Sequence, residues 1–331
     1  MIEALIFLGI ASAKGAVVLA GLLIAVQYAV LLERKLVGRL QSRLGPNRVG
    51  PFGLLQPLAD AVKLMFKEDI LPSQADLPIY LLAPAAAVVP ALMAFAVIPL
   101  GPPIQLLGRE IPLYIADLNV GLLFFFAMSS MGVYGVVLAG WSSGSKYSSL
   151  GGLRSSAQMV SYELAQGLAV LGAVMLVGSL SLVEMVEAQS DLWIVVLQPL
   201  GFGIFFVASL AEVNRAPFDL PEAETELVAG YHTEYSSLKW ALFFMAEYVN
   251  IIVVSSIAVT VFLGGWQGGI LPPVVWYFVK VGALVLLFVW IRATLPRLRY
   301  DQLMALGWKV LLPLSVLNLM ATALVVVLTG G

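Results

Sequence analysis

Eight long apolar runs dominate the chain, and each is long enough to cross a lipid bilayer as a helix. About 20 apolar residues span the ~30 Å hydrocarbon core of a membrane. The runs fall at residues 2–32, 78–100, 118–140, 157–182, 193–211, 238–263, 272–291 and 309–328. Composition agrees, because 60% of the residues are hydrophobic and 11% are charged, whereas a soluble domain is about half apolar and a quarter charged. We predict an all-α integral membrane protein with about eight transmembrane helices, forming one polytopic domain over residues 1–331.

The first run reads as a retained span rather than a signal peptide. Glu3 lies near its start, and neither a basic segment nor a small-residue cleavage site accompanies it. Because there is no presequence, we expect a multi-pass protein of a bacterial inner membrane rather than of an organelle.

Lys and Arg residues fix the expected orientation, because positively charged loops stay on the cytoplasmic side. Fifteen of the 18 lie in or beside the loops after the first, third, fifth and seventh runs. Only Arg109 lies in an opposite loop, whereas Lys14 and Lys280 fall inside helices and are expected to snorkel outward. Both termini are therefore expected outside. The cytoplasmic loops are expected at about 33–77, 141–156, 212–237 and 292–308.

Residues that bind redox centres are scarce. Cysteine is absent, and the one histidine is His232. A cysteine-ligated iron–sulfur cluster, a bis-histidine haem and a Cys/His zinc site within this chain alone are thereby excluded. His232 lies near Glu234 and Tyr235, and we interpret it as a structural residue rather than a general base. Any redox chemistry that the chain serves must lie on a partner.

The first cytoplasmic loop is basic and rich in Gly-Pro turns, and its plainest interpretation is a loop paired with anionic lipid. After it, a polar stripe recurs at helical spacing over 54–67. It consists of Gln56, Asp60, Lys63 and Lys67. The opposite stripe is Leu55, Leu58, Val62, Met65 and Phe66. The pattern predicts an interfacial amphipathic helix, whose polar face is either merely solvated or lines the mouth of a cavity for a ligand with a polar head and an apolar tail.

Three carboxylates fall within or at the edge of the expected bilayer: Glu163, Glu212 and Glu247. Carboxylates in such places are costly and are usually functional or paired. Neither Glu163 nor Glu247 has an obvious cation partner within its own helix, which weakens the interpretation as a simple ion pair. We favour a proton relay over a structural hydrogen bond.

The loop after Glu212 is strongly acidic and contains Pro and Phe residues that favour a packed, stiff segment. Its carboxylates are Glu212, Asp219, Glu222, Glu224 and Glu226, and its one base is Arg215. Crowded carboxylates raise one another's pKa values. The last cytoplasmic loop carries Arg292, Arg297 and Arg299, which we expect to neutralise this acidic loop.

Several strings closely resemble the H subunit of respiratory complex I, the proton-pumping NADH:quinone oxidoreductase. They are ERK at 33–35, QSRLGPNRVGPFGLLQ at 41–56, ADLNVGLL at 116–123, RSSAQMVSYE at 154–163, AEVNRAPFDLPEAETELVAG at 211–230 and RLRYDQLM at 297–304. The resemblance runs from the first helix to Lys309. One departure is Ser236-Ser237, where many relatives have Ser-Gly.

The resemblance implies a membrane subunit whose cytoplasmic loops form the floor and mouth of a quinone tunnel, and which links quinone reduction to proton translocation. Quinone is then a substrate, no cofactor is bound covalently, and the iron–sulfur clusters and FMN lie on partner subunits. The implied partners are the other membrane-arm subunits, the peripheral iron–sulfur subunits and lipid, with no nucleic acid.

The resemblance also assigns residues. Lining or edging the quinone path would be Glu33, Arg34, Asp60, Lys63, Arg215, Glu222 and Glu224, with Asp219, Arg292 and Arg297 as further charged lining. Glu163, Glu212 and Glu247 would carry protons from that cavity into the membrane.

Two alternatives remain open. A membrane subunit of an energy-converting hydrogenase would share the helices without needing a quinone site, although the intact RLGPN and NRAPFDLP strings favour the quinone enzyme. A stand-alone proton or cation transporter would use the intramembrane carboxylates, but we see no matching broken helices in two halves of the sequence.

Overall fold

The computed structural model describes residues 2–106, 108–219, 228–269 and 271–329. The described chain is almost entirely helical, as predicted. Its longer helices are α1 (Ile2–Leu40), α2 (Gln56–Phe66), α3 (Leu77–Ala94), α4 (Gly121–Ser142), α5 (Lys146–Val177), α8 (Pro199–Glu212), α10 (Ser237–Phe262), α11 (Pro273–Thr294) and α13 (Leu312–Thr329). Shorter helices are α6 (Leu182–Glu187), α7 (Ile194–Leu197) and α12 (Tyr300–Leu306). The strands β1 (Ile104–Leu106) and β2 (Arg109–Ile111) form an antiparallel hairpin.

Seven helices of the described chain are long and apolar enough to span a membrane. The fifth predicted span, 193–211, is instead divided into α7 and α8, and α8 has 14 residues. The break lies at Gln198, because the following Pro199 disfavours helical backbone angles in the residue before it. The Gln198 side chain bonds Asn318 at 2.8 Å, which ties the break to α13.

Two helices extend further into the cytoplasmic loops than the apolar runs suggest. Helix α1 continues to Leu40, so that Glu33 and Arg34 lie on a helix. Helix α5 begins at Lys146 rather than near 157, which leaves only a short turn between α4 and α5. The added part of α1 contains Glu, Arg, Lys and Leu, which have good helix propensity. The added part of α5 is rich in Ser and Gly, and Gly151 and Gly152 lie against Gly230 and Gly140, so that packing rather than propensity accounts for this extension. Helix α2 forms over the predicted amphipathic segment.

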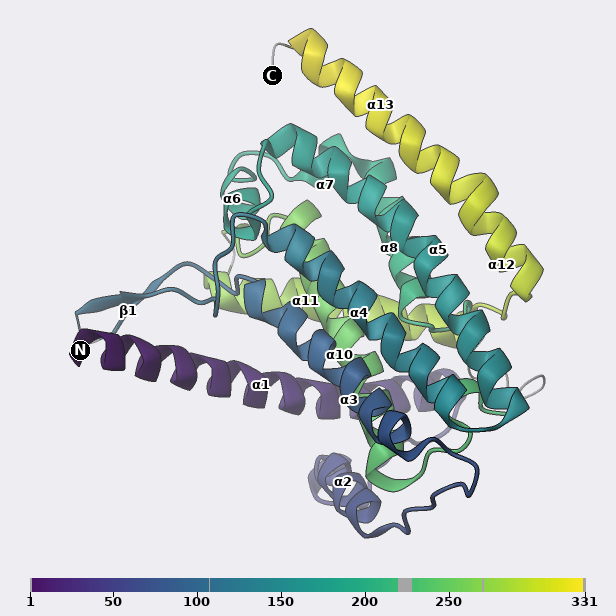
Figure 1. The fold of residues 1–331 in the computed structure, drawn as a ribbon. Coiled ribbons are helices and arrows are strands. Elements are labelled where there is room, and N and C mark those ends of the chain that lie inside the picture. Colours follow the sequence, from purple (N-terminus) through teal and green to yellow (C-terminus); the bar gives the residue numbers. More distant parts are fainter. Residues whose placement is uncertain (1, 107, 220–227, 270, 330–331) are drawn as a thin grey trace.

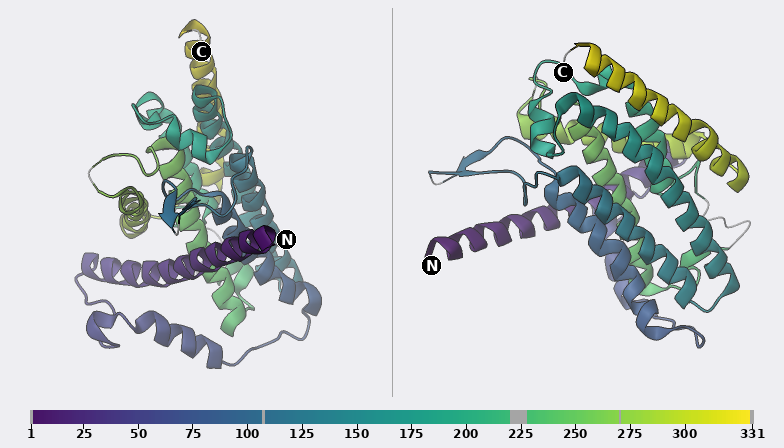
Figure 2. Two further views of the ribbon diagram at one scale, coloured as in Figure 1. Left: turned by 90° about the vertical axis from the view of Figure 1, so that its left-hand side faces the viewer. Right: turned by 45° about the horizontal axis from the view of Figure 1, so that its top comes forward.

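The long helices pack around α10, and most of the residues in its apolar stretch are buried. Figure 1 shows α3, α4 and α5 side by side, with α1 and α13 at opposite edges of the bundle. Figure 2 shows α2 at the margin of the bundle, alongside α1, and α2 contacts both α1 and α10. The peripheral helices α1 and α13 bury little of their surface within this chain.

Small residues let α3, α4 and α5 approach closely. A Cβ atom built on Gly135 of α4 would lie 2.6 Å from the Ala87 backbone nitrogen of α3. A Cβ on Gly140 would lie 2.7 Å from the Ser148 carbonyl of α5. Close backbone approach at small residues is a usual mode of helix association in membranes.

The start of α10 contains the Ser236-Ser237 pair. Ser237 has a φ of 54°, in the left-handed region, which fits the glycine of many relatives. Its hydroxyl donates to the Leu64 carbonyl at 2.9 Å, and the Ser236 hydroxyl accepts from the Ile70 backbone amide at 2.8 Å. The serine pair therefore attaches α2 and the segment after it to α10.

The prediction that Lys280 snorkels outward into solvent is wrong. The side chain points to the outer end of α10, but it is only 8% exposed. Its ammonium donates to the carbonyls of Leu263 and Gln267, both at 2.6 Å, and lies 4.2 Å from the Trp193 ring centroid. The unpaired carbonyls at the helix end replace water as its partners. Lys14 likewise bonds a carbonyl, that of Tyr114, at 3.1 Å.

We predict that Gly135→Ala destabilises the purified protein by about 1–3 kcal/mol, because the added methyl group overpacks the α3–α4 contact. Thermal unfolding in detergent measures the loss. Gly132→Ala is the matched control on the same helix, since no atom lies within 4 Å of a Cβ there. Equal unfolding midpoints for the two variants would contradict the close-approach interpretation.

Candidate functional site

A cluster of charges is buried at the end of the bundle that carries the predicted cytoplasmic loops, which we call the inner end. We define the buried charge cluster as Glu33, Arg215, Glu247, Tyr248 and Arg292. Arg215 is 3% exposed and forms ion pairs with Glu247 and, at 3.7 Å, with Glu33. Arg292 pairs with the same oxygen of Glu33. Two acids and two bases, drawn from α1, α10, α11 and the turn after α8, thus balance one another.

Tyr248 completes the cluster from α10. Its hydroxyl donates to Glu33 Oε2 at 2.8 Å, and its ring centroid lies 4.5 Å from the Arg215 guanidinium. Glu33 therefore has a partner on each of its oxygens. Glu247 obtains its cation from the turn that follows α8, whereas Lys239 of its own helix pairs with Asp69.

The turn that carries Arg215 is held by backbone bonds from two sides. Gln158 of α5 donates to the carbonyls of Ala211 and Phe218, both at 2.7 Å. The Leu298 amide donates to the Pro217 carbonyl at 3.0 Å. Because its backbone is fixed on both sides of Arg215, the guanidinium projects in a defined direction.

A second charged group joins α1 to α2 and is more exposed. Arg34 pairs with Asp60 at 2.5 Å, and Lys63 lies 3.8 Å from the same carboxylate. Gln56 donates to Asp60 at 2.9 Å. The polar stripe predicted on α2 therefore faces the inner end of α1. The apolar stripe on the opposite face of α2 is exposed to solvent, and Phe66 in it is 87% exposed.

The predicted residues of the acidic loop and of the last cytoplasmic loop do not form a single group among the described residues. Glu222, Glu224 and Glu226 lie outside the described residues. Arg297 donates to the backbone carbonyl of Asp219. The expectation that the last loop's bases neutralise the acidic loop stays a prediction, because Glu222, Glu224 and Glu226 are not among the described residues. The partners that the described residues supply are different. Arg292 pairs with Glu33, and Arg299 pairs with Asp301 at 3.1 Å. Their partners come from neighbouring helices or from the same turn.

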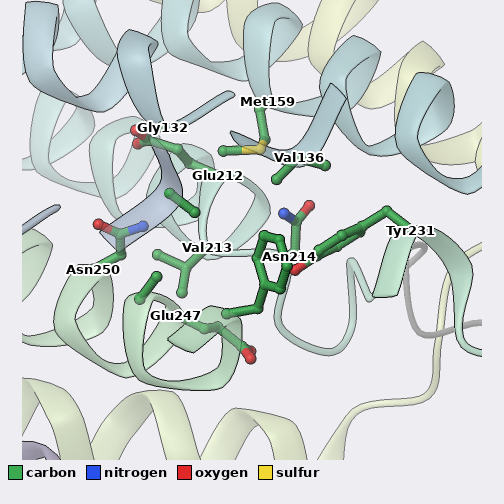
Figure 3. Close-up of a pocket in the computed structure, with 12 residues that line it drawn as sticks. Gly132, Val136, Met159, Glu212, Val213, Asn214, Tyr231, Glu247 and Asn250 are labelled. Carbon is green, nitrogen blue, oxygen red and sulfur yellow. The ribbon is translucent and has the colours of Figure 1, made fainter. Parts of the chain in front are cut away.

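A small cavity separates the buried charge cluster from Glu212. It measures about 40 Å³ and is lined by Glu212, Asn214, Tyr231, Glu247 and Asn250, among others. About 10–15 Å³ of such volume holds one water molecule, so that a few fit here. Figure 3 shows the carboxylates of Glu212 and Glu247 pointing away from each other, with their stems at the cavity wall. The Asn side chains supply polar surface between them.

A second, smaller cavity lies deeper and shares Glu212 and Asn250 with the first. It also reaches Ser129 of α4, whose hydroxyl donates to Glu212. The next residue, Ser130, donates to Glu163. Two adjacent hydroxyls of one helix therefore contact the two deepest carboxylates. This pair was not predicted, and a Ser-Ser step inside an apolar run is the only sign of it in the sequence.

Glu163 lies at the far end of this series. It borders an apolar groove of about 590 Å³ between α4 and α5, which opens on the side of the bundle. Nearby, Gln166 donates to the Ser209 hydroxyl at 2.9 Å. Unlike Glu247, Glu163 is paired with a hydroxyl rather than with a cation. The structure thus brings the three predicted intramembrane carboxylates into one series, Glu247, Glu212 and Glu163.

The turn after the acidic loop supports the cavity wall. His232 packs edge-to-face on Tyr231, with ring centroids 5.0 Å apart. Tyr235 stacks on Tyr80 at 4.2 Å and donates to its carbonyl at 3.2 Å. Burial raises the pKa of Tyr235 to about 12, so this hydroxyl stays protonated. Among the described residues, no group of three or more His, Asp or Glu could hold a metal ion.

Seven long apolar helices around a buried, charge-balanced inner end define a polytopic membrane protein with ionisable groups in its interior. The chain belongs to the NADH dehydrogenase family, whose model matches residues 13–323.

Similar proteins cover nearly the whole chain. NADH-quinone oxidoreductase H subunit 2 of Geobacter sulfurreducens is 57% identical over 315 residues, which is 95% of this chain and 96% of that protein. The protein of the same name in Syntrophobacter fumaroxidans is 57% identical over 310 residues, or 94% of each chain. That of Rhizobium meliloti is 52% identical over 325 residues, covering 98% of this chain and 99% of its own. These bacterial relatives and the seven apolar helices fit a multi-pass inner-membrane protein.

We predict that Arg215→Met lowers the free energy of unfolding by about 3–5 kcal/mol, because it leaves two carboxylates buried beside a single remaining base. The matched control is Arg34→Met, which removes an exposed ion pair worth about 0–1 kcal/mol. Denaturation of the purified protein in detergent compares them. Similar losses for both variants would show that burial does not distinguish the two ion pairs.

Proposed function

We propose that this chain is the membrane H subunit of an NADH:quinone oxidoreductase, and that it holds the mouth of the quinone path and links quinone reduction to proton translocation. The observation that supports this most directly is the continuity from the buried charge cluster, through a polar cavity, to Glu212, Ser129, Ser130 and Glu163. The names of the relatives favour it over a hydrogenase component or a solitary carrier.

Electrons would arrive from outside the chain. The absence of cysteine leaves cysteine-ligated iron–sulfur clusters to partner subunits. FMN would also lie on a partner. Quinone would be a substrate held between this chain and those partners. Docking of the partners on the inner face would complete the chamber.

The quinone path would begin at α1 and α2. A quinone has a polar headgroup and an apolar tail, and α2 offers a face for each. Arg34, Asp60 and Lys63 form the polar side, whereas exposed Phe66 belongs to the apolar side. The headgroup would pass this charged group and approach Glu33, Arg215 and Arg292, with Asp219, Glu222, Glu224 and Arg297 as further lining.

Arg215 would convert quinone chemistry into proton movement. Its guanidinium lies between Glu33 and Glu247. Reduction of a quinone takes up two electrons and two protons, and the quinol formed is neutral. If side chains of the chamber supply those protons, the charge beside Glu33 changes. If Arg215 moves towards Glu33, Glu247 loses its cation, and a buried carboxylate without a cation binds a proton. Water in the cavity beside Asn214 and Asn250 would then carry a proton towards Glu212.

Ser130 gives the last carboxylate two hydrogen-bonding states. Its hydroxyl is within bonding distance of both Glu163 and the Phe126 carbonyl, the latter at 3.0 Å. A hydroxyl has one hydrogen to donate. With Glu163 ionised, Ser130 donates to it. With Glu163 protonated, the Ser130 oxygen accepts a hydrogen bond from the carboxyl O–H, and the Ser130 hydroxyl donates to the Phe126 carbonyl instead.

We predict that Glu163→Gln permits assembly but slows or uncouples quinone-linked turnover, because the amide cannot take up and release a proton. NADH:quinone activity and proton pumping in membranes from a strain carrying the variant measure the effect. The matched control is Glu187→Gln, an exposed outer carboxylate in α6. Full activity together with full pumping in the Glu163 variant would exclude the relay role.

We predict that Ser130→Ala slows pumping-linked turnover about tenfold, the value of a hydrogen bond to a charged group. Ser130→Thr keeps a hydroxyl and should restore most of the rate. Ser156→Ala removes an exposed hydroxyl from α5 and serves as control. The solvent isotope effect on turnover should rise in the Ala variant, which a purely structural role would not cause. Equal rates for the Ala and Thr variants would argue against the hydroxyl.

A further inference from the structure

An apolar groove lies between the inner ends of α1 and α11. It has a volume of about 470 Å³ and is lined by Leu36 and Leu40 of α1 and by Leu284, Leu287 and Trp290 of α11, among others. Trp290 is 58% exposed. Every lining side chain is apolar except for the indole nitrogen of Trp290, which belongs to the residue type that is enriched at the membrane–water interface.

Bases without carboxylate partners lie at the inner end of this groove. Arg39 precedes Leu40 in the last turn of α1, and the Arg43 amide bonds the Gly38 carbonyl at 2.8 Å, which holds Arg43 beside that turn. Both side chains are exposed. Arg43 contacts the neutral Gln41, at 2.8 Å. Within the described part of the chain, no carboxylate pairs with either arginine.

Two other arginines of the same helices, Arg34 of α1 and Arg292 of α11, differ from Arg39 and Arg43 in having carboxylate partners. Arg34 is paired with Asp60, and Arg292 with Glu33. Their charge is thereby balanced, whereas Arg39 and Arg43 keep their full charge available among the residues that the structure describes. An apolar channel that ends at such guanidinium groups on the inner membrane face is complementary to a lipid with an anionic head.

We propose that this groove binds one acyl chain of an anionic phospholipid, whose phosphate is held by Arg39 and Arg43. Guanidinium groups bind phosphate oxygens in a bidentate manner, and the inner leaflet supplies anionic lipid to basic segments beside transmembrane helices. A quinone, which has no formal charge, gains little from such guanidinium groups. The site therefore differs in chemistry from the path proposed at Arg34 and Asp60.

The position of the site relates it to the buried charge cluster. Leu36 lies three residues after Glu33, and Trp290 lies two residues before Arg292. A lipid in the groove would contact both helices that carry this ion pair. The proposal does not depend on the proposed function, since lipid binding is measured without turnover.

The test uses the full chain in nanodiscs of mixed phosphatidylglycerol and phosphatidylcholine, one of them brominated on its acyl chains. Bromine quenches nearby tryptophan fluorescence, and the contribution of Trp290 among the seven tryptophans is obtained by difference from Trp290→Phe. We expect quenching of Trp290 to favour brominated phosphatidylglycerol. Neutralising each arginine should weaken that preference about fivefold.

The double variant Arg39→Gln, Arg43→Gln removes both charges and should weaken the preference for phosphatidylglycerol. The double variant Arg39→Lys, Arg43→Lys keeps both charges and should retain most of that preference. Lys146→Gln, which removes an exposed base at the start of α5, should leave it unchanged. Ala283→Phe fills the groove from its exposed side and should abolish the preference for phosphatidylglycerol. Equal quenching by both lipids in the wild-type chain would overturn the proposal. So would displacement of brominated phosphatidylglycerol by an equimolar long-chain quinone, which would assign the groove to quinone.

Discussion

Arg215 and its two carboxylates are the interaction on which the inner end of the molecule depends. A guanidinium that is 3% exposed is tolerated only when anions lie beside it. Those anions come from α1 and α10, and Arg292 of α11 balances the second of the two charges. Apolar helix faces in a membrane permit many relative rotations, whereas these pairs permit few. The same contacts therefore determine both the helix arrangement and the electrostatics of the chamber.

The ionisable side chains change in character with depth. At the inner end, Glu33 and Glu247 are matched with arginines. Further in, Glu212 and Glu163 accept hydrogen bonds from serine hydroxyls. The series thus passes from carboxylates paired with arginines to carboxylates bonded to serine hydroxyls.

Much of this organisation could be predicted from sequence. Hydropathy located the membrane helices, and helical periodicity located α2, because both depend on neighbouring residues alone. Pairing across the bundle is different. Nothing local shows that Glu247 is paired with Arg215, or that Ser129 and Ser130 contact Glu212 and Glu163. Hydropathy averaged over a window also misses the break at Gln198, since one residue changes the backbone without changing the mean.

The break at Gln198 has a consequence for the depth of charge in the membrane. At 1.5 Å per residue, the 14 residues of α8 cover about 21 Å, which is less than the ~30 Å hydrocarbon core. Helix α5, with 32 residues, covers about 48 Å beside it. A helix of this length does not cross the hydrocarbon core by itself. The turn that follows α8 places Arg215 among α1, α10 and α11, so the charge reaches the interior of the bundle from a turn rather than from the middle of a long helix.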